Sequence, residues 1–210
     1  MNDVRVVLIG GTSNVGKSTV AQGVAEQLGF ECLSTDGLAR HPGRPWRTPE
    51  WEVPPHVAEH YGSLTVDELI ASVLRHHEIL WPRIEELITA RASEGSAGRG
   101  LVLEGSALRP DRVAGLKVPH TAAVWLTTDH AVVRARVHAA GRYDAATSEE
   151  QHLMDKFLAR TQCYQTLMID AVDTLGLDRI DAGHGQSVTA LVDSVLASVD
   201  AQHALGRSPH

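Results

Sequence analysis

The chain alternates short apolar runs with longer stretches in which apolar residues recur at helical spacing. Residues 4–9 are rich in β-branched side chains and lead into glycines, which is typical of a strand buried on both faces. Because such runs alternate with helical stretches, the pattern predicts an α/β fold with helices on both faces of a mostly parallel sheet. The predicted strands are residues 4–9, 31–35, 101–103, 122–126 and 179–181.

The predicted helices have recognisable ends. Thr65-x-x-Glu68 and Ser148-x-x-Gln151 match the capping box, in which two side chains satisfy free amides at the start of a helix. Gly141 is a suitable residue to end the third helix. Helices are predicted over residues 17–28, 65–88, 129–140, 148–175 and 187–199.

The organisation predicted for the chain is one domain over residues 1–203 with a flexible tail at 204–210. Residues 41–55 contain five prolines and should form an irregular loop. This loop and the helices after it lie between the second and third strands. We therefore expect residues 38–98 to be a substrate-binding insertion, and residues 134–150 to form a lid.

Composition and charge limit the kinds of partner that the chain is expected to bind. With 210 residues, 43% of them hydrophobic and 21% charged, the chain can fill a core. The formal net charge of −7 argues against nucleic acid or an anionic membrane as the main partner. The two cysteines, Cys32 and Cys163, form no paired motif, and no apolar stretch is long enough to predict a membrane span. A cytoplasmic location is expected.

A phosphate-binding motif follows the first strand. The segment Gly11-Thr12-Ser13-Asn14-Val15-Gly16-Lys17-Ser18 fits G-x-x-x-x-G-K-[ST] at every fixed position. Glycines let backbone amides surround phosphate oxygens, and the helix N-terminus adds a favourable dipole. Lys17 should reach the β and γ phosphates of a nucleotide, and the Ser18 hydroxyl should bind Mg²⁺. Nucleotide contacts are expected from residues 11–18 and from Thr19.

Two acidic residues at strand ends indicate phosphoryl transfer. Asp36 follows the second strand, where a carboxylate can accept the proton of an attacking hydroxyl. Glu104 ends the third strand, where a carboxylate holds Mg²⁺ directly or through water. We assign Asp36 as the base and Glu104 to the metal, although the pattern alone also permits the reverse assignment.

Basic residues then follow the second and fourth strands. Phosphoryl transfer spreads negative charge over three oxygens, and arginines neutralise it. We expect Arg136 and Arg142 to act from the lid, with Arg134 in solvent. The residues expected to contact the acceptor are Asp36, Arg40, His41, Arg44, Trp46 and Glu104.

The residues at these three places resemble the 2-phosphoglycerate kinase group of P-loop kinases. The resemblance rests on residues 10–19, on Ser34-Thr35-Asp36 and on Glu104-Gly105-x-x-Leu108-x-Pro110. Residues 136–144 and 180–184 also resemble chloramphenicol phosphotransferase. This implies a three-layer P-loop fold with sheet order 2-3-1-4-5, ATP with Mg²⁺, and adenine near the lid helix and residues Gly183 and His184. Residues 38–46 match neither relative, so no acceptor is implied.

Two other features of the sequence have plainer interpretations. His56-x-x-Glu59-His60 matches the inverted zinc-peptidase motif, but with twelve histidines in the chain such matches arise easily by chance. His77 is interpreted as a structural histidine that could line the substrate pocket, and Trp81 as a core residue.

The sequence therefore predicts an ATP-dependent kinase that phosphorylates a hydroxyl group of a small molecule. Two alternatives remain open at this point. One is a nucleoside or nucleotide kinase, which would share all the same parts. The other is an ATP-hydrolysing switch or binding module that acts on a partner. The oligomeric state, monomer or homodimer, is not predicted.

Overall fold

The computed structural model describes residues 4–38, 43–48, 51–93, 98–183 and 185–206. At its centre is a five-stranded sheet with the order β2-β3-β1-β4-β5, and every pair of neighbouring strands is parallel. The α/β class and the order 2-3-1-4-5 are thus confirmed. The strands are β1 (Val6–Gly11), β2 (Glu31–Ser34), β3 (Leu101–Gly105), β4 (Thr121–Thr127) and β5 (Arg179–Asp181).

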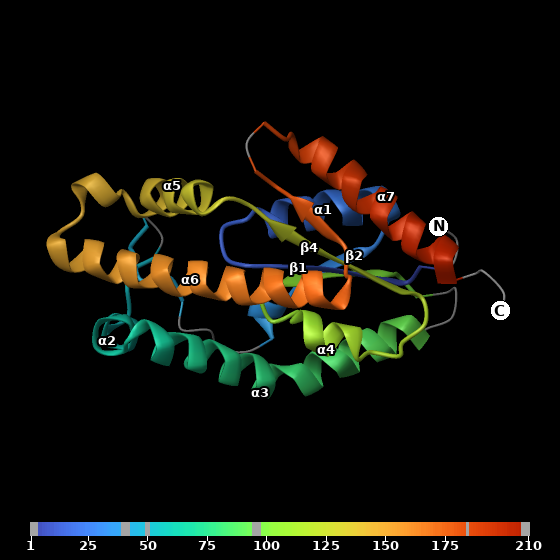
Figure 1. The fold of residues 1–210 in the computed structure, drawn as a ribbon, viewed down its shortest axis with the longest axis horizontal. Helices are drawn as coiled ribbons and strands as arrows, with labels where there is room; N and C mark the ends of the chain where they lie inside the picture. Colours follow the sequence, from blue (N-terminus) through green and yellow to red (C-terminus); the bar gives the residue numbers. More distant parts are fainter. Residues whose placement is uncertain (1–3, 39–42, 49–50, 94–97, 184, 207–210) are drawn as a thin grey trace.

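Helices cover both faces of the sheet (Figure 1). Helices α1 and α7 pack together on one face, while α3, α4 and the second half of α6 cover the other. The helical segments are α1 (Lys17–Leu28), η1 (Thr35–Gly37), α2 (Pro55–Ser63), α3 (Val66–Ser93), α4 (Pro110–Ala114), α5 (His130–Gly141), η2 (Tyr143–Ala145), α6 (Ser148–Leu175) and α7 (Val188–Gly206).

The pleat of β1 divides the core into two halves. Val6 and Leu8 pack with α3 and the end of α6, whereas Val7 and Ile9 pack with α1 and α7. Successive side chains of a strand point to opposite faces, so a strand in the centre of a three-layer fold must be apolar at every position. All six residues of β1 are buried. This double burial fixes the point at which the chain leaves β1 for the glycine-rich turn.

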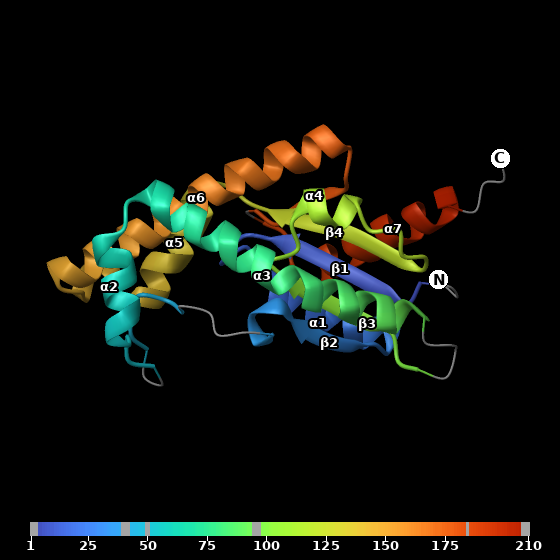
Figure 2. The same cartoon turned by 90° about the horizontal axis from the view of Figure 1, so that it is seen from below.

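A helical lobe extends beyond the carboxyl ends of the strands (Figures 1 and 2). It consists of α2, α5 and the first halves of α3 and α6, and α6 continues from the lobe onto the sheet. The contacts of α6 with α2, α3, α4, α5 and β4 join the two parts. Ligands of parallel α/β sheets bind beyond the carboxyl ends of the strands, which is the edge of the sheet that the lobe borders.

Several element boundaries differ from the predicted ones. The cap of α6 is Thr147 with Glu150, one residue before the predicted Ser148 and Gln151. Helix α5 ends with Arg142, not Gly141, in the left-handed conformation. Helix α7 continues to Gly206, beyond the predicted end at 199. Helix α4 was not predicted, because its five residues are too few to show a period.

The predicted capping box of α3 is present. The Thr65 amide and hydroxyl both donate to a Glu68 carboxylate oxygen at 2.8 Å. No helix in the described part of the chain has the length and apolar character that crossing a membrane requires.

Candidate functional site: a phosphate loop between two cavities

The glycine-rich turn after β1 has the backbone of a phosphate-binding loop. Gly16 has φ 103° and precedes α1, a conformation that a side chain would strain. Asn14 is also left-handed, with φ 64°, and its Nδ2 is buried without a hydrogen-bond partner in the described structure. Such a loop turns its amides toward one concave surface at a helix N-terminus, where anions bind.

Lys17 lies across this loop. Its Nζ donates a hydrogen bond to the Thr12 carbonyl oxygen at 2.7 Å, and the residue is only 8% exposed. Burial lowers the pKa of Lys17, while the nearby carboxylates of Glu104 and Asp36 act in the opposite direction. The ammonium group is therefore close to both predicted acids and poorly solvated, as a phosphate-binding cation should be.

Ser18 and Glu104 meet at the carboxyl end of β3. The Ser18 Oγ donates to Glu104 Oε1 at 3.0 Å, and Glu104 is 5% exposed. The next residue, Gly105, allows the end of β3 to lie against buried Thr35, because a Cβ at this position would overlap the Thr35 side chain. A hydroxyl oxygen and a carboxylate are the hard donors that Mg²⁺ selects, so these two residues fit the metal that the resemblance implies.

Asp36 faces the same space from the end of β2. It lies in η1, is exposed to solvent, and its amide donates to Ser34 Oγ at 3.3 Å. A cavity of about 230 Å³, here called the transfer cavity, joins Asp36 to the phosphate loop. It is lined by Ser13, Asn14, Lys17, Ser18, Asp36, Gly43, Arg44, Glu104, Ser106 and Phe157.

A second cavity, here called the nucleotide cavity, lies on the α1 side of the loop and has a volume of about 500 Å³. Arg136 of α5 reaches across it, with Nη1 donating to the Asn14 carbonyl oxygen at 2.9 Å. The remaining wall comes from the start of α7 and the loop before it. Its lining residues are 14–20, Arg44, Arg136, Ala182, Gln186, Val188 and Leu191.

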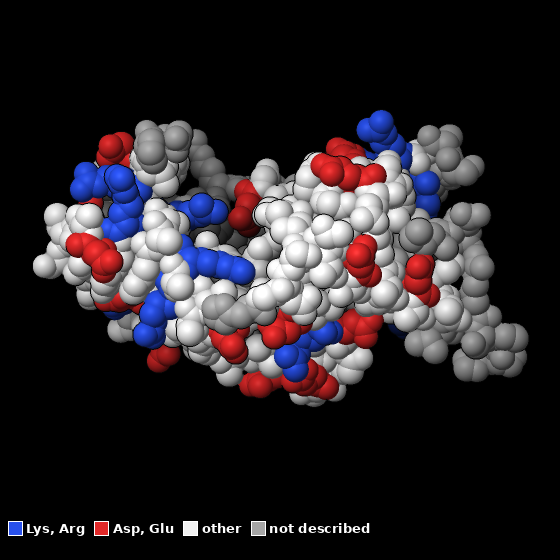
Figure 3. Space-filling model, turned by 90° about the horizontal axis from the view of Figure 1, so that it is seen from above, with Lys and Arg blue, Asp and Glu red and all other residues white. Residues whose placement is uncertain are grey.

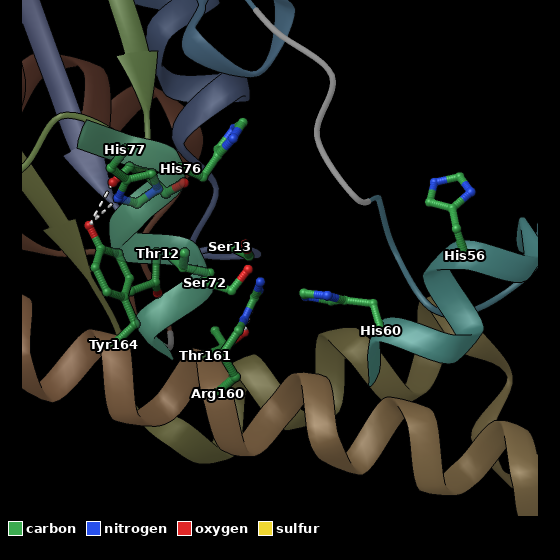
Figure 4. Close-up of a pocket in the computed structure, with 12 residues that line it drawn as sticks. Thr12, Ser13, His56, His60, Ser72, His76, His77, Arg160, Thr161 and Tyr164 are labelled. Atoms are coloured by element: carbon green, nitrogen blue, oxygen red, sulfur yellow. Dashed lines mark hydrogen bonds between the residues drawn. The ribbon is translucent and has the colours of Figure 1, made fainter. Parts of the chain in front are cut away.

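A third cavity, here called the lobe cavity, has a volume of about 490 Å³ and lies between α2, α3 and α6 (Figure 4). It shares Ser13 and Ser106 with the transfer cavity, so the two spaces adjoin. Figure 3 shows the opposite face of the molecule, which carries α1, α5 and α7, with a hollow between lobe and sheet and Lys and Arg side chains on its lobe side. The lining residues are Thr12, Ser13, His56, His60, Ser72, Val73, His76, His77, Ser106, Arg160, Thr161 and Tyr164.

The structure places the other expected site residues unevenly. Arg44 lines both the transfer and the nucleotide cavities, beside the phosphate loop and away from the lobe cavity. Trp46 is 1% exposed and packs edge-on against Phe157, with ring centroids 4.9 Å apart. Arg142 lies beside Trp46, away from the phosphate loop. Gly183 donates its amide to Asp181 Oδ1 at 2.9 Å. Arg40, His41 and His184 lie outside the described residues.

The histidine motif lies within the lobe. His56 and His60 are on α2 and both line the lobe cavity. Within the described ranges, no group of three His, Cys, Asp or Glu side chains is arranged to hold a metal ion. His77 is buried in the same cavity wall, its Nδ1 3.4 Å from Tyr164 Oη, and Trp81 lies in the core as predicted.

Sequence reasoning missed the contribution of α6. Arg160, Thr161 and Tyr164 line the lobe cavity, and the buried Gln165 donates to the Thr128 carbonyl oxygen at 2.7 Å. Gln165 also lies 3.1 Å from Thr12 Oγ1, so α6 supports the phosphate loop directly. A signal was present: Arg160 falls on the apolar stripe, three residues after Phe157 and four before Tyr164.

Comparison with protein-family models and with curated proteins gives no match. Solved structures do match. A sugar kinase from Janibacter sp. HTCC2649 has a TM-score of 0.56 and 21% identity, over 99% of each chain. A gluconokinase from Sinorhizobium meliloti 1021 has a TM-score of 0.54 and 18% identity, also over 99% of each chain. A deoxyadenosine kinase from M. mycoides, with bound dATP, has a TM-score of 0.52 and 14% identity, over 93% of this chain and 99% of that chain. These likenesses show that the chain shares its fold with these three kinases.

Proposed function

We propose that the chain is an ATP-dependent kinase that transfers the γ-phosphoryl group to a hydroxyl of a small molecule. The observation that carries the proposal is the succession of three adjoining cavities. The nucleotide cavity shares Lys17 and Ser18 with the transfer cavity, which in turn shares Ser13 and Ser106 with the lobe cavity. A phosphoryl donor in the nucleotide cavity and an acceptor in the lobe cavity can therefore bind separately, and their reacting groups can meet between Lys17 and Asp36.

The residues around the transfer cavity have distinct tasks. Asp36 takes the proton of the acceptor hydroxyl, because it is the exposed carboxylate of the transfer cavity. Lys17, Arg44 and Arg136 neutralise the charge of the phosphate oxygens. Ser18 and Glu104 would hold Mg²⁺, which when bound supplies electrostatic stabilisation of the transferred group. Arg142 is retained as a lid residue that would approach only on closure.

The lobe cavity favours this function over the alternatives. An ATP-hydrolysing switch needs only a water molecule beside the γ-phosphate, whereas this chain has a cavity of about 490 Å³ next to the transfer cavity. The sugar, gluconate and deoxyadenosine kinases of similar fold are proteins that act on small molecules. Every lining residue except Val73 carries a polar group, which suits a polar acceptor.

The test is a count of ADP released per acceptor phosphorylated. Purified protein with ATP and Mg²⁺ is offered sugars, sugar acids, amino alcohols and nucleosides, and ADP is measured with and without each compound. A kinase releases ADP only with an acceptor present, in a one-to-one ratio with the phosphorylated product. Acceptor-independent hydrolysis at the same rate would identify a switch instead. Lys17→Ala provides the inactive control.

A further inference from the structure

One charged residue of the lobe cavity has no function in the proposal above. Arg160 projects from α6 and is 5% exposed, although it lies at the wall of the lobe cavity. Figure 4 shows its side chain pointing away from α6 into the cavity, with the His60 ring directed toward it from α2. A permanently charged side chain with so little access to bulk solvent requires compensation.

The contacts of Arg160 supply hydrogen bonds but no opposite charge. Nη1 donates to Tyr61 Oη at 3.1 Å and Nη2 donates to Thr161 Oγ1 at 3.3 Å. The guanidinium carbon lies 4.6 Å from the Phe157 ring centroid and 5.7 Å from that of Tyr61. In the described part of the chain, no carboxylate forms an ion pair with it.

Two half-buried arginines of this chain, Arg109 and Arg91, are paired with carboxylates, whereas half-buried Arg5 donates to the Gly98 carbonyl oxygen. Arg109 contacts Glu78 at 2.5 Å and Asp111 at 2.7 Å, and Arg91 contacts Glu31 at 2.5 Å. All three carboxylates come from within the protein. Arg160 is more deeply buried than Arg109 or Arg91. Those two arginines face a carboxylate, whereas Arg160 faces the lobe cavity.

The rest of the lobe cavity also suits an anion. No Asp or Glu is among its lining residues, whereas His56, His60 and His76 stand around it and Ser72 and Thr161 offer hydroxyl groups. In Figure 4 the Ser72 side chain is directed into the cavity from α3. The overall net charge of the chain is −7, so a cavity lining without acids departs from the general composition.

We infer that Arg160 binds an anionic group of the acceptor, so that the substrate carries a carboxylate or a phosphate at one end and the reacting hydroxyl at the other. The inference rests on the proposed kinase function and names the substrate class of that site. Ser13 and Ser106 mark the passage from the lobe cavity to the transfer cavity, so an acceptor anchored on Arg160 presents its far end to Asp36. A guanidinium fork binds either anion in two parallel hydrogen bonds.

The experiment compares Arg160→Met with wild type and with Arg91→Met. Methionine keeps the apolar contacts of the side chain and removes the charge. Arg91 is a paired arginine at the end of α3, next to the start of β2 and remote from the lobe cavity. ADP release is measured with gluconate against glucose and with glycerol 3-phosphate against glycerol, which separates the carboxylate and phosphate sources. The melting temperature is measured with the same four compounds in the presence of saturating ADP and Mg²⁺.

The expected result is that one anionic member of a pair is the better substrate and raises the melting temperature of wild type. Arg160→Met should raise the KM for that compound by about 10²-fold. Its ATP KM should stay unchanged, and without ligand it should melt no lower than wild type, because an uncompensated charge has been removed. Arg91→Met should melt lower and keep both KM values. Arg160→Lys, which keeps the charge but not the fork of the guanidinium group, should have an acceptor KM between those of wild type and Arg160→Met.

Three outcomes would overturn the inference. In the first, neutral acceptors are phosphorylated as efficiently as anionic ones, and Arg160→Met leaves the KM of both kinds of acceptor unchanged. The kinase function would then stand without the anion site. In the second, Arg160→Met melts several degrees lower with an unchanged acceptor KM, which makes Arg160 a structural residue. In the third, none of the anions raises the melting temperature. If the anions raise it through Arg160 but no compound is phosphorylated, the anion site stands and the kinase function fails.

Discussion

Two carboxylates face the transfer cavity, and their surroundings differ. Asp36 is exposed beside the lobe, whereas Glu104 is buried and accepts a hydrogen bond from Ser18 at 3.0 Å. A general base must reach the acceptor hydroxyl, while a metal partner must lie beside the Ser18 hydroxyl. The geometry therefore favours the assignment in which Asp36 is the base and Glu104 belongs to the metal.

Paired substitutions separate these roles. Asp36→Asn should lower kcat by about 10²–10⁴-fold with little change in ATP binding, because it removes a proton acceptor and keeps the shape. Glu104→Gln should make the rate depend more steeply on Mg²⁺ concentration, and excess Mg²⁺ should restore part of it. The measurement is kcat as a function of Mg²⁺ for both variants. Rescue of Asp36→Asn by Mg²⁺, without rescue of Glu104→Gln, would reverse the roles.

His60 adds a pH dependence. Burial, and then the nearby charge of Arg160, lower the pKa of His60 below its usual value. The unfolded chain therefore binds a proton on His60 more readily than the folded chain does. The contribution of the neutral His60 ring to folding stability is fully present above the unfolded pKa of about 6.5, and it is lost as the pH falls below that value. His60→Gln should accordingly lose less stability between pH 7.5 and pH 5.5 than wild type does.

The control for this comparison is His152→Gln. His152 is an exposed residue of α6, and its replacement should leave the acid loss of stability as in wild type. The measurement is the melting temperature across the pH range for the three proteins. Equal slopes for wild type and His60→Gln would show that the His60 ring is not kept neutral by its surroundings.

At the residue scale, sequence reasoning succeeded where local geometry dictates the residue type. The strand before Gly11 and the helix after Gly16 allow one kind of turn, and the structure shows it. The role of Arg160 was missed, although its place on the apolar stripe of α6 was visible in the sequence. An arginine on a helix is ordinarily a solvated residue, and only the packing of Tyr61 and Phe157 around it, from two separate helices, makes it a buried cation.

Helix α6 connects the lobe to the sheet, so its start has consequences for the site. Thr147 accepts a hydrogen bond from the Glu150 amide, and the Glu150 carboxylate accepts one from the Thr147 amide at 2.8 Å. Glu150 also pairs with Arg47 at 2.8 Å, which ties the loop after β2 to this helix. The cap therefore stabilises both the helix and a part of the loop that precedes the lobe.

Thr147→Ala should cost about 1 kcal/mol of stability, because an amide at the helix start loses its acceptor. For a chain of this size the melting temperature should fall by about 2–4 °C. Ser148→Ala is the matched control, since Ser148 is the first residue of the helix and its side chain does not cap it. An equal fall for both variants would indicate general loss of helix stability, whereas a larger fall for Ser148→Ala would restore the cap predicted from sequence.

At the element scale, periodicity identified the long helices and all five strands, but the ends were less certain. Both Thr147-x-x-Glu150 and Ser148-x-x-Gln151 satisfy the capping pattern, and the choice between them depends on where the preceding η2 turn delivers the chain. Arg142 takes a left-handed conformation that favours glycine, although Gly141 stands directly before it. Gly141 is instead required within the helix, where a Cβ would meet the sulfur of Met154.

At the scale of the whole molecule, α6 and the phosphate loop link the lobe cavity to the nucleotide cavity. Gln165 of α6 contacts Thr12, the loop residue whose carbonyl oxygen accepts from Lys17. The sheet order that the resemblance to P-loop kinases implied is the one observed. The lobe cavity was not predicted, because it is built from three helices whose mutual packing no single stretch of sequence reveals.

Nucleotide binding should stabilise the whole fold through the residues of the nucleotide cavity. A ligand at 100 times its dissociation constant adds about 2.7 kcal/mol to the stability of the state that binds it. For a chain of this length that corresponds to a rise of about 5–10 °C in melting temperature. Lys17→Ala should lose most of this rise, since the buried Lys17 ammonium lies across the phosphate loop. Lys117→Ala, at an exposed lysine after α4, should keep all of it.

The measurement is the melting temperature of the three proteins with ATP and Mg²⁺, at concentrations set from the wild-type dissociation constant. A full rise in Lys17→Ala would place ATP outside the phosphate loop and remove the basis of the kinase proposal.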